Sequence, residues 1–314
     1  MKTKALLLIM VVLVCVINIY SKNKSILIES KRLGKNIFWQ GMSKIGGYIY
    51  VLGKKDNNIY LYSDYSKKTK NITKYFKTSN VYIADDRLIE HSSPETFIIY
   101  SIDGIRNKII TLPNKANRVY LELYGSDSEY YCSYEFRTLK PHPNPGIIRV
   151  SDNKILYEYE DWGIGYGIPS MVFLKDCFVA NDKTEYVLKV YDKRGALLRI
   201  IKHPLFISKE YTDEERKTLL PTIQEYFNKK PYYPQVITDF KIVGNNLIVL
   251  RRGRPNDKYI LVDIFNFING GFIKTVKIPK LVHSGIYDWY ADYDKIWMLL
   301  KQDNNYILNS YKTP

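Results

Sequence analysis

Four histidines are the residues of this chain best suited to proton transfer or metal binding. They are His91, His142, His203 and His283. An imidazole changes charge near neutral pH and is a common metal ligand. However, none has a second ligand at H-x-x-x-H spacing, His142 lies among prolines, and His203 precedes Pro204. Two interpretations therefore remain: a metal or acid/base cluster, and solvated loop residues.

Arg251, Arg252 and Arg254 form a short cationic cluster. The planar guanidinium group binds carboxylates and phosphates through paired hydrogen bonds, so the cluster is a candidate for gripping an acidic ligand or partner. The alternative is a hairpin whose charges are solvated.

Asp161 and Trp162 open a glycine-rich run that ends at Gly167. The run lacks the helix and the Lys-Ser/Thr pair of a phosphate-binding loop, so we interpret it as a linker with Trp162 packed beneath it. Asp161, Asp182 and Asp239 could line a central opening and hold calcium, which prefers carboxylate oxygens. The sequence identifies no catalytic residue and no cofactor.

Repeated strands must position these candidates. Six segments share a turn residue followed by an apolar run, and they begin at Gly47, Asp86, Ser128, Asp176, Asn246 and Asp294. Most of these starts lie about 40–50 residues apart, a period typical of propeller blades made of four antiparallel strands. The pattern predicts an all-β fold, a six-bladed β-propeller over residues 22–314.

Two departures from the repeat give further predictions. The last blade is short by one strand, and the strand-like segment Ile26–Arg32 has no blade of its own, so we expect it to close the ring as the outermost strand of blade six. The longer interval between Asp176 and Asn246 contains a helical insertion, residues 205–233. Thr212 and Glu215 have capping-box spacing, and we expect helices at 213–220 and 221–228, the only helical segment after the leader.

The first 21 residues resemble a targeting segment. Lys2 and Lys4 precede an apolar run from Ala5 to Ile17, which suits a signal peptide and is short for a bilayer span. An uncleaved membrane anchor and a lipoprotein modified at Cys15 are the alternatives. All three predict export. The remaining Cys132 and Cys177 lie in apolar strand-like runs and are expected to be separate thiols.

The net charge is +15, spread along the chain in single residues and pairs. Such a charge favours anionic lipid headgroups, acidic glycans or nucleic acid, unless the lysines are simply solvated. Export and the absence of an RRM, helix-turn-helix or zinc-finger pattern exclude nucleic acid as the expected partner.

Strand parity places the candidates. If each blade runs outward from its inner strand, the loops after the second and fourth strands share one side of the disc, which we call the loop face. The loop face is predicted to receive the insertion and the candidate residues for ligand or partner binding: His91, His203, His283, Asp161, Trp162, Asp182, Arg251, Arg252 and Arg254. Loops on a rigid scaffold commonly form binding sites.

Tyr191, Gly195 and Pro204 keep the same offsets as Tyr100, Gly104 and Pro113, and the insertion is followed by YPQVITDFKIVGNNLIVLRRG. With the strand-only period and the closing N-terminal strand, these features make residues 26–314 similar to six-bladed propellers of bacterial envelopes, the TolB-like and NHL-like group, which are often lipoproteins. The resemblance implies a binding or scaffold protein of the periplasm or the membrane surface.

The sequence therefore supports two hypotheses of function. The first is an exported, non-catalytic propeller that binds an envelope protein or an acidic glycan through its loop face, with the N-terminal segment as a membrane tether. The second is a metal-dependent propeller hydrolase or lyase with its site at the central opening, built from Asp161, Asp182 and Asp239.

Overall fold

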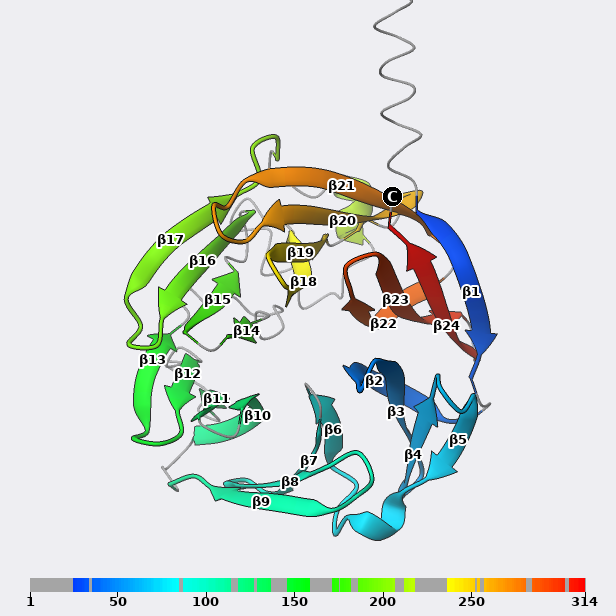
Figure 1. The fold of residues 1–314 in the computed structure, drawn as a ribbon, viewed down its shortest axis with the longest axis vertical. Helices are drawn as coiled ribbons and strands as arrows, with labels where there is room; N and C mark the ends of the chain where they lie inside the picture. The colour runs from blue at the N-terminus through cyan, green and yellow to red at the C-terminus, as the bar shows by residue number, and fades with distance from the viewer. Residues whose placement is uncertain are drawn as a thin grey trace, which may run out of the picture.

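The chain folds into six four-stranded sheets arranged around a central axis (Figure 1). The computed structural model describes residues 25–33, 36–84, 87–113, 118–126, 129–136, 146–158, 171–174, 176–181, 186–206, 212–217, 236–251, 253–254, 257–280, 284–302 and 305–313. In every sheet, neighbouring strands are antiparallel. The predicted six-bladed β-propeller is confirmed.

The blades follow one another along the chain. The first three consist of β2 Phe38–Ile45, β3 Tyr48–Lys55, β4 Asn58–Ser63 and β5 Lys68–Asn71; β6 Val81–Ala84, β7 Arg87–Ser93, β8 Thr96–Tyr100 and β9 Arg106–Thr111; and β10 Arg118–Ser126, β11 Glu129–Phe136, β12 Gly146–Arg149 and β13 Lys154–Glu158. The last three consist of β14 Met171–Phe173, β15 Cys177–Asn181, β16 Val187–Asp192 and β17 Leu197–Lys202; β18 Ile237–Val243, β19 Asn246–Arg251, β20 Tyr259–Asn266 and β21 Phe272–Pro279; and β22 Ser284–Ala291, β23 Lys295–Gln302, β24 Asn305–Lys312 and β1 Ile26–Arg32.

The six apolar segments that define the repeat are the second strands of the six blades. They are buried on both faces because each sheet packs between its neighbours, so they lack the alternation of a surface strand. Val249 and Leu250 in β19, for example, are fully buried. Tight turns join the strands, and Gly104 shows why one of them requires glycine. Its φ is +89°, and an added Cβ would lie 2.4 Å from the ring of Tyr75.

The ring is closed by the two ends of the described chain. β1 pairs with β24 in an antiparallel register from Ile26 opposite Lys312 to Arg32 opposite Ile307. The ladder continues where the backbone N–H of Leu33 donates to the carbonyl of Tyr306 over 2.9 Å. Residues 26–32 are therefore the outermost strand of blade six, as predicted.

Hydrogen bonds also link the inner strands of successive blades. Bulges occur in β2, β18 and β22 directly before Gly41, Asp239 and Asp288, where they redirect side chains toward the next blade. The links run from Trp289 Nε1 to Asp239 over 2.8 Å, from Met42 N to Asp288, from Gln40 Nε2 to the Val81 carbonyl over 2.9 Å, and from Leu123 N to the Tyr82 hydroxyl over 2.7 Å.

Helical structure is limited in the part of the chain that the structure describes. The helix α2, Asp213–Lys217, begins directly after Thr212, as predicted, while residues 218–235 and the second predicted helix lie outside the described residues. The expectation of a single helical segment is wrong, because a 3-10 helix, η1 Thr73–Tyr75, joins blades one and two. Neither helix has the length and apolar character needed to span a bilayer. Cys132 and Cys177 are not joined in a disulfide, as expected.

Removing the closing strand should destabilise the propeller much more than trimming a terminus normally does. A chain that starts at Lys35 loses the β1 ladder, and with about 1 kcal/mol per net hydrogen bond we expect a loss of roughly 5 kcal/mol. Thermal unfolding measures the effect, and the matched control is a chain that starts at Ser25. Similar midpoints for the two truncated chains would contradict the closing role of β1.

Asp288 should give the stability a distinctive pH dependence. Part of the residue is exposed, but desolvation of its carboxylate raises its pKa to about 6. The folded protein then binds a proton that the unfolded chain has released, so the stability from this group falls as pH rises from 4 to 6. Relative to Asp288→Asn, the wild type should lose up to about 3 kcal/mol over that range.

Asp292, just after the end of the same strand, supplies the control. Its hydrogen bond with Lys44 lowers its pKa, so its contribution is present above pH 4 and is lost in acid. Denaturant titrations from about pH 2 to pH 7 should therefore show opposite trends: relative to Asp288→Asn the wild type loses stability as the pH rises from 4 to 6, and relative to Asp292→Asn it loses stability as the pH falls below 4. Trends of the same sign would refute the assignment.

Candidate functional site

Arg251 forms the centre of a charged cluster beneath the loop face. It is the last residue of β19, and its Nε and Nη2 atoms donate to the two carboxylate oxygens of Asp263 in β20, the second over 2.8 Å. Thr275 in β21 donates its hydroxyl to the same carboxylate. The Asp263 side chain is 0% exposed and that of Arg251 only 18%. Arg251 thus binds a carboxylate as its chemistry suggests, but the carboxylate belongs to its own blade.

Blade four supplies the other half of the cluster. The Tyr186 hydroxyl donates to Asp263 over 2.7 Å, and His203 Nε2 lies 3.0 Å from Arg251 Nη2. Burial lowers the pKa of His203, with opposing effects from Asp263 and Arg251, so the ring is neutral at pH 7. Burial, followed by Asp263, raises the pKa of Tyr186 well above its ordinary value, which keeps the phenol protonated.

The cluster also holds the root of the helical insertion. The backbone N–H of Leu205 donates to His203 Nδ1 over 3.1 Å. The Phe206 ring lies 5.3 Å from that of Tyr186, and the Arg251 guanidinium lies 5.9 Å from the Phe206 centroid. Leu205 itself is 81% exposed. The chain therefore leaves blade four from a fixed point on the loop face.

These contacts satisfy the carboxylate from four donors and join blade four to blade five. A buried carboxylate that accepts this many hydrogen bonds has no lone pair left for a reacting group. Glu90 in β7 plays a comparable part in blade two, where it accepts from the backbone of Lys77 and Thr78 and from the Tyr100 hydroxyl. We therefore assign both carboxylates to the scaffold that supports the loop face.

The remaining candidates divide between described and undescribed residues. His91 stacks on Phe97 at 4.5 Å, its Nε2 is buried without a hydrogen-bond partner, and burial lowers its pKa. The backbone N–H of Arg254 donates to Asp257 over 2.6 Å. Asp239 accepts from Trp289 and pairs with Lys241 at 3.1 Å. The candidates outside the described residues are His142, His283, Asp161, Trp162, Asp182 and Arg252.

Among the described residues, the structure brings together His203 and Arg251 but gathers no group of three His, Cys, Asp or Glu side chains suited to a metal ion. Asp263, Tyr186 and Thr275 are not among the residues predicted from the sequence. A signal was present for Asp263, since a single carboxylate stands inside the apolar strand YILVDIFN. A charge at such a position requires a partner, although the partner's identity needs the fold.

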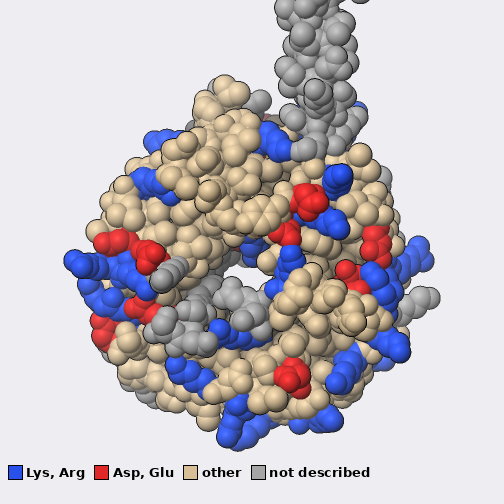
Figure 2. Space-filling view, viewed as in Figure 1, with Lys and Arg blue, Asp and Glu red and all other residues tan. Residues whose placement is uncertain are grey.

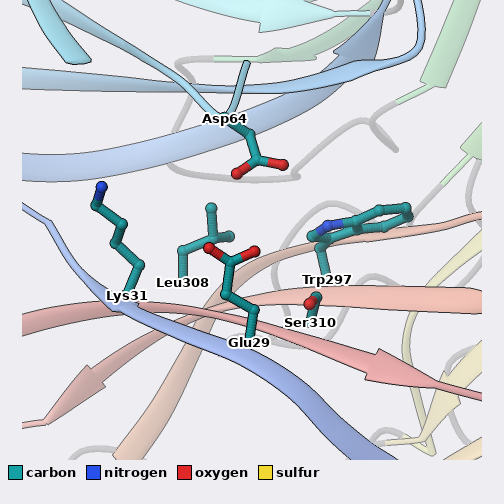
Figure 3. Close-up of a pocket in the computed structure, with 6 residues that line it drawn as sticks. All are labelled: Glu29, Lys31, Asp64, Trp297, Leu308 and Ser310. Atoms are coloured by element: carbon teal, nitrogen blue, oxygen red, sulfur yellow. The ribbon is translucent and has the colours of Figure 1, made fainter. Parts of the chain in front are cut away.

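A recess between blades six and one is lined by Glu29, Lys31, Asp64, Trp297, Leu308 and Ser310 (Figure 3). The carboxylates of Glu29 and Asp64 point into the same space. Lys67 binds both carboxylates, and Lys31 lies 5.5 Å from the Tyr62 centroid. Burial, followed by Asp64, raises the pKa of Tyr62 to about 12. These charges neutralise one another, so we do not interpret the recess as a ligand site. It is a seam at which Lys67 of blade one holds Glu29 of β1.

The geometry defines a six-bladed β-propeller in which the cluster around Asp263 joins blades four and five and the cluster around Glu90 lies within blade two. No family model matches the sequence, and no curated protein matches it. A solved structure of a DUF4221 family member from Bacteroides vulgatus is similar to this chain with a TM-score of 0.55 and 13% identity, covering 93% of this chain and 99% of the other. This likeness extends over the whole propeller and concerns the fold.

Breaking the cluster around Asp263 should lower the free energy of unfolding by more than the loss of a single surface contact would. Asp263→Ala leaves the Arg251 guanidinium largely buried without its carboxylate, so we expect a loss of about 3–5 kcal/mol. Thr275→Val removes one hydrogen bond and should cost about 1 kcal/mol. Chemical denaturation measures both. The double variant Arg251→Met with Asp263→Leu should recover much of the loss, and a strictly additive loss would show that the two residues are not coupled.

Proposed function

We propose that the protein is an exported, non-catalytic propeller that serves as a binding platform, and that its loop face contacts another protein of the cell envelope. The insertion at residues 205–233 is the observation that carries this proposal. Its root is fixed by Phe206 and His203, while Leu205 and the helix residues Asp213, Glu214 and Lys217 are exposed. Exposed side chains on a firmly held root suit recognition of a partner.

Two further features support a platform. Three titratable groups beneath the loop face, Arg251, Asp263 and His203, are engaged with one another where blades four and five meet. The closed ring also supplies a rigid support, because β1 and β24 leave blade six with the same four strands as the other blades. The resemblance to envelope propellers that the sequence repeat suggests supports export and a binding role.

Crosslinking in intact cells, followed by affinity recovery and mass spectrometry, tests the proposal. In one variant a short Gly-Ser linker replaces residues 207–233. The control is Asp294→Asn, which removes an exposed charge from the β22–β23 turn on the opposite face. We expect one stoichiometric envelope protein with the wild type and the control, and its loss with the linker variant.

Thermal unfolding must show that both variants retain the wild-type midpoint. Recovery of the same proteins with the linker variant would overturn the role of the insertion. Recovery of a polysaccharide in place of a protein would assign the loop face to an acidic glycan and would overturn the choice of partner class.

A further inference from the structure

Exposed apolar side chains gather on the side of the disc opposite the loop face. We call this side the turn face, because it carries the turns that join the first strand to the second and the third strand to the fourth. Each of blades one to five presents large apolar residues at its third-to-fourth connection. They are Tyr65, Ile105, Ile155, Leu197, Leu198, Ile268 and Ile273, between 44% and 69% exposed.

Blade six supplies the equivalent residues from the start of β1. The antiparallel pairing with β24 places this start on the turn face, and Ile26, Leu27 and Ile28 are 69%, 50% and 49% exposed. Two first-to-second turns add Tyr48 and Tyr293. Over the described residues, the exposed large apolar side chains away from the turn face are fewer, namely Phe38, Leu205 and Tyr287 near the loop face and Ile109 and Ile200 in the middle of the outer strands β9 and β17.

Exposed cations accompany these apolar residues in the same connections, where the carboxylates of Asp103 and Asp152 are exposed as well. Lys68 follows Tyr65, Arg106 follows Ile105, Lys154 precedes Ile155, Arg194 precedes Leu197, and Lys312 lies opposite Ile26. Figure 2 shows broad uncharged areas between groups of Lys and Arg, with Asp and Glu interspersed among these groups. Apolar and tyrosine side chains combined with cations are typical of surfaces that lie at a membrane interface.

The leader directs this face toward a membrane. The apolar run ends by Tyr20, and only the polar residues 21–25, which include Lys22 and Lys24, separate it from β1. At about 3.4 Å per residue, five residues reach at most roughly 17 Å. If the leader stays in the membrane, the propeller is held within that distance by a strand that starts on the turn face. The turn face then meets the lipid headgroups.

We infer that the turn face lies on an anionic lipid bilayer, with its tyrosine and aliphatic side chains at the interface and its lysines and arginines on the headgroups. This inference rests on the exported state in the proposed function and on the membrane tether that the N-terminal segment is expected to supply. It is independent of the partner that the loop face binds. In this inference, side chains from all six blades, together with the leader, set the orientation of the disc relative to the membrane.

Vesicle cosedimentation tests the inference with the chain from Ser25 onward, which retains every described strand of the ring. The vesicles contain either 30% phosphatidylglycerol in phosphatidylcholine, or phosphatidylcholine alone. We expect binding to the anionic vesicles that weakens with salt. The triple variant Ile105→Ser, Leu198→Ser and Ile268→Ser should bind at least about tenfold more weakly, because less apolar area enters the interface.

The matched control is Leu205→Ser, which removes a more exposed aliphatic side chain from the loop face. It should bind as the wild type does, and thermal unfolding should show that both variants are folded. Unchanged binding of the triple variant, an equal loss with Leu205→Ser, or equal binding to the uncharged vesicles would overturn the inference. None of these results bears on the capture of a partner by the insertion, so the two proposals fail separately.

Discussion

The pairing of β1 with β24 is the constraint on which the rest of the structure depends. A propeller blade buries its faces against two neighbours, so an open ring would expose the faces between blades six and one. In the closed ring, Trp39 and Val51 of blade one pack with Leu299 and Leu308 of blade six in one buried cluster. Because β1 comes from the N-terminal end and β24 from the C-terminal end, closure also joins the most distant parts of the sequence. Blades six and one are also joined at the inner strands, near the bulge in β2, and at the outer strands, where Lys67 binds Glu29 of β1.

Two buried carboxylates, Asp263 and Glu90, also stabilise the arrangement of the sheets. A carboxylate inside an apolar strand is costly unless its oxygens are paired, and both Asp263 and Glu90 meet that condition with partners that the fold brings to them. Asp263 joins neighbouring blades, while Glu90 holds the backbone just before β6 against its own blade. Polar contacts have strict geometry, so they fix how adjacent sheets sit in a way that apolar packing alone does not. The loops above them gain a rigid support.

The backbone arrangement could be predicted from the sequence because propeller strands have a local sequence pattern. Each second strand is a short apolar run after a turn residue, and Ile26–Arg32 was recognised as the closing strand because blade six lacked a strand. The partners of individual side chains could not be predicted in this way. Parity correctly ended β19 on the loop face, but it could not show that Arg251 turns back onto Asp263, twelve residues later in the chain. The η1 turn at Thr73–Tyr75 was missed because three residues carry no helical periodicity.

The two faces of the disc differ in the kinds of chain connection that they carry. The turn face receives short connections within each blade, which repeat around the ring and can only vary in a few side chains. The loop face receives the connections between blades, which can lengthen without disturbing a sheet, and the insertion after β17 is such a lengthening. A repeated surface suits an extended, featureless partner such as a lipid bilayer, whereas a unique insertion suits a specific one. Since β1 starts on the turn face and β17 ends on the loop face, the tether that we propose would place the root of the insertion on the side of the disc away from the membrane.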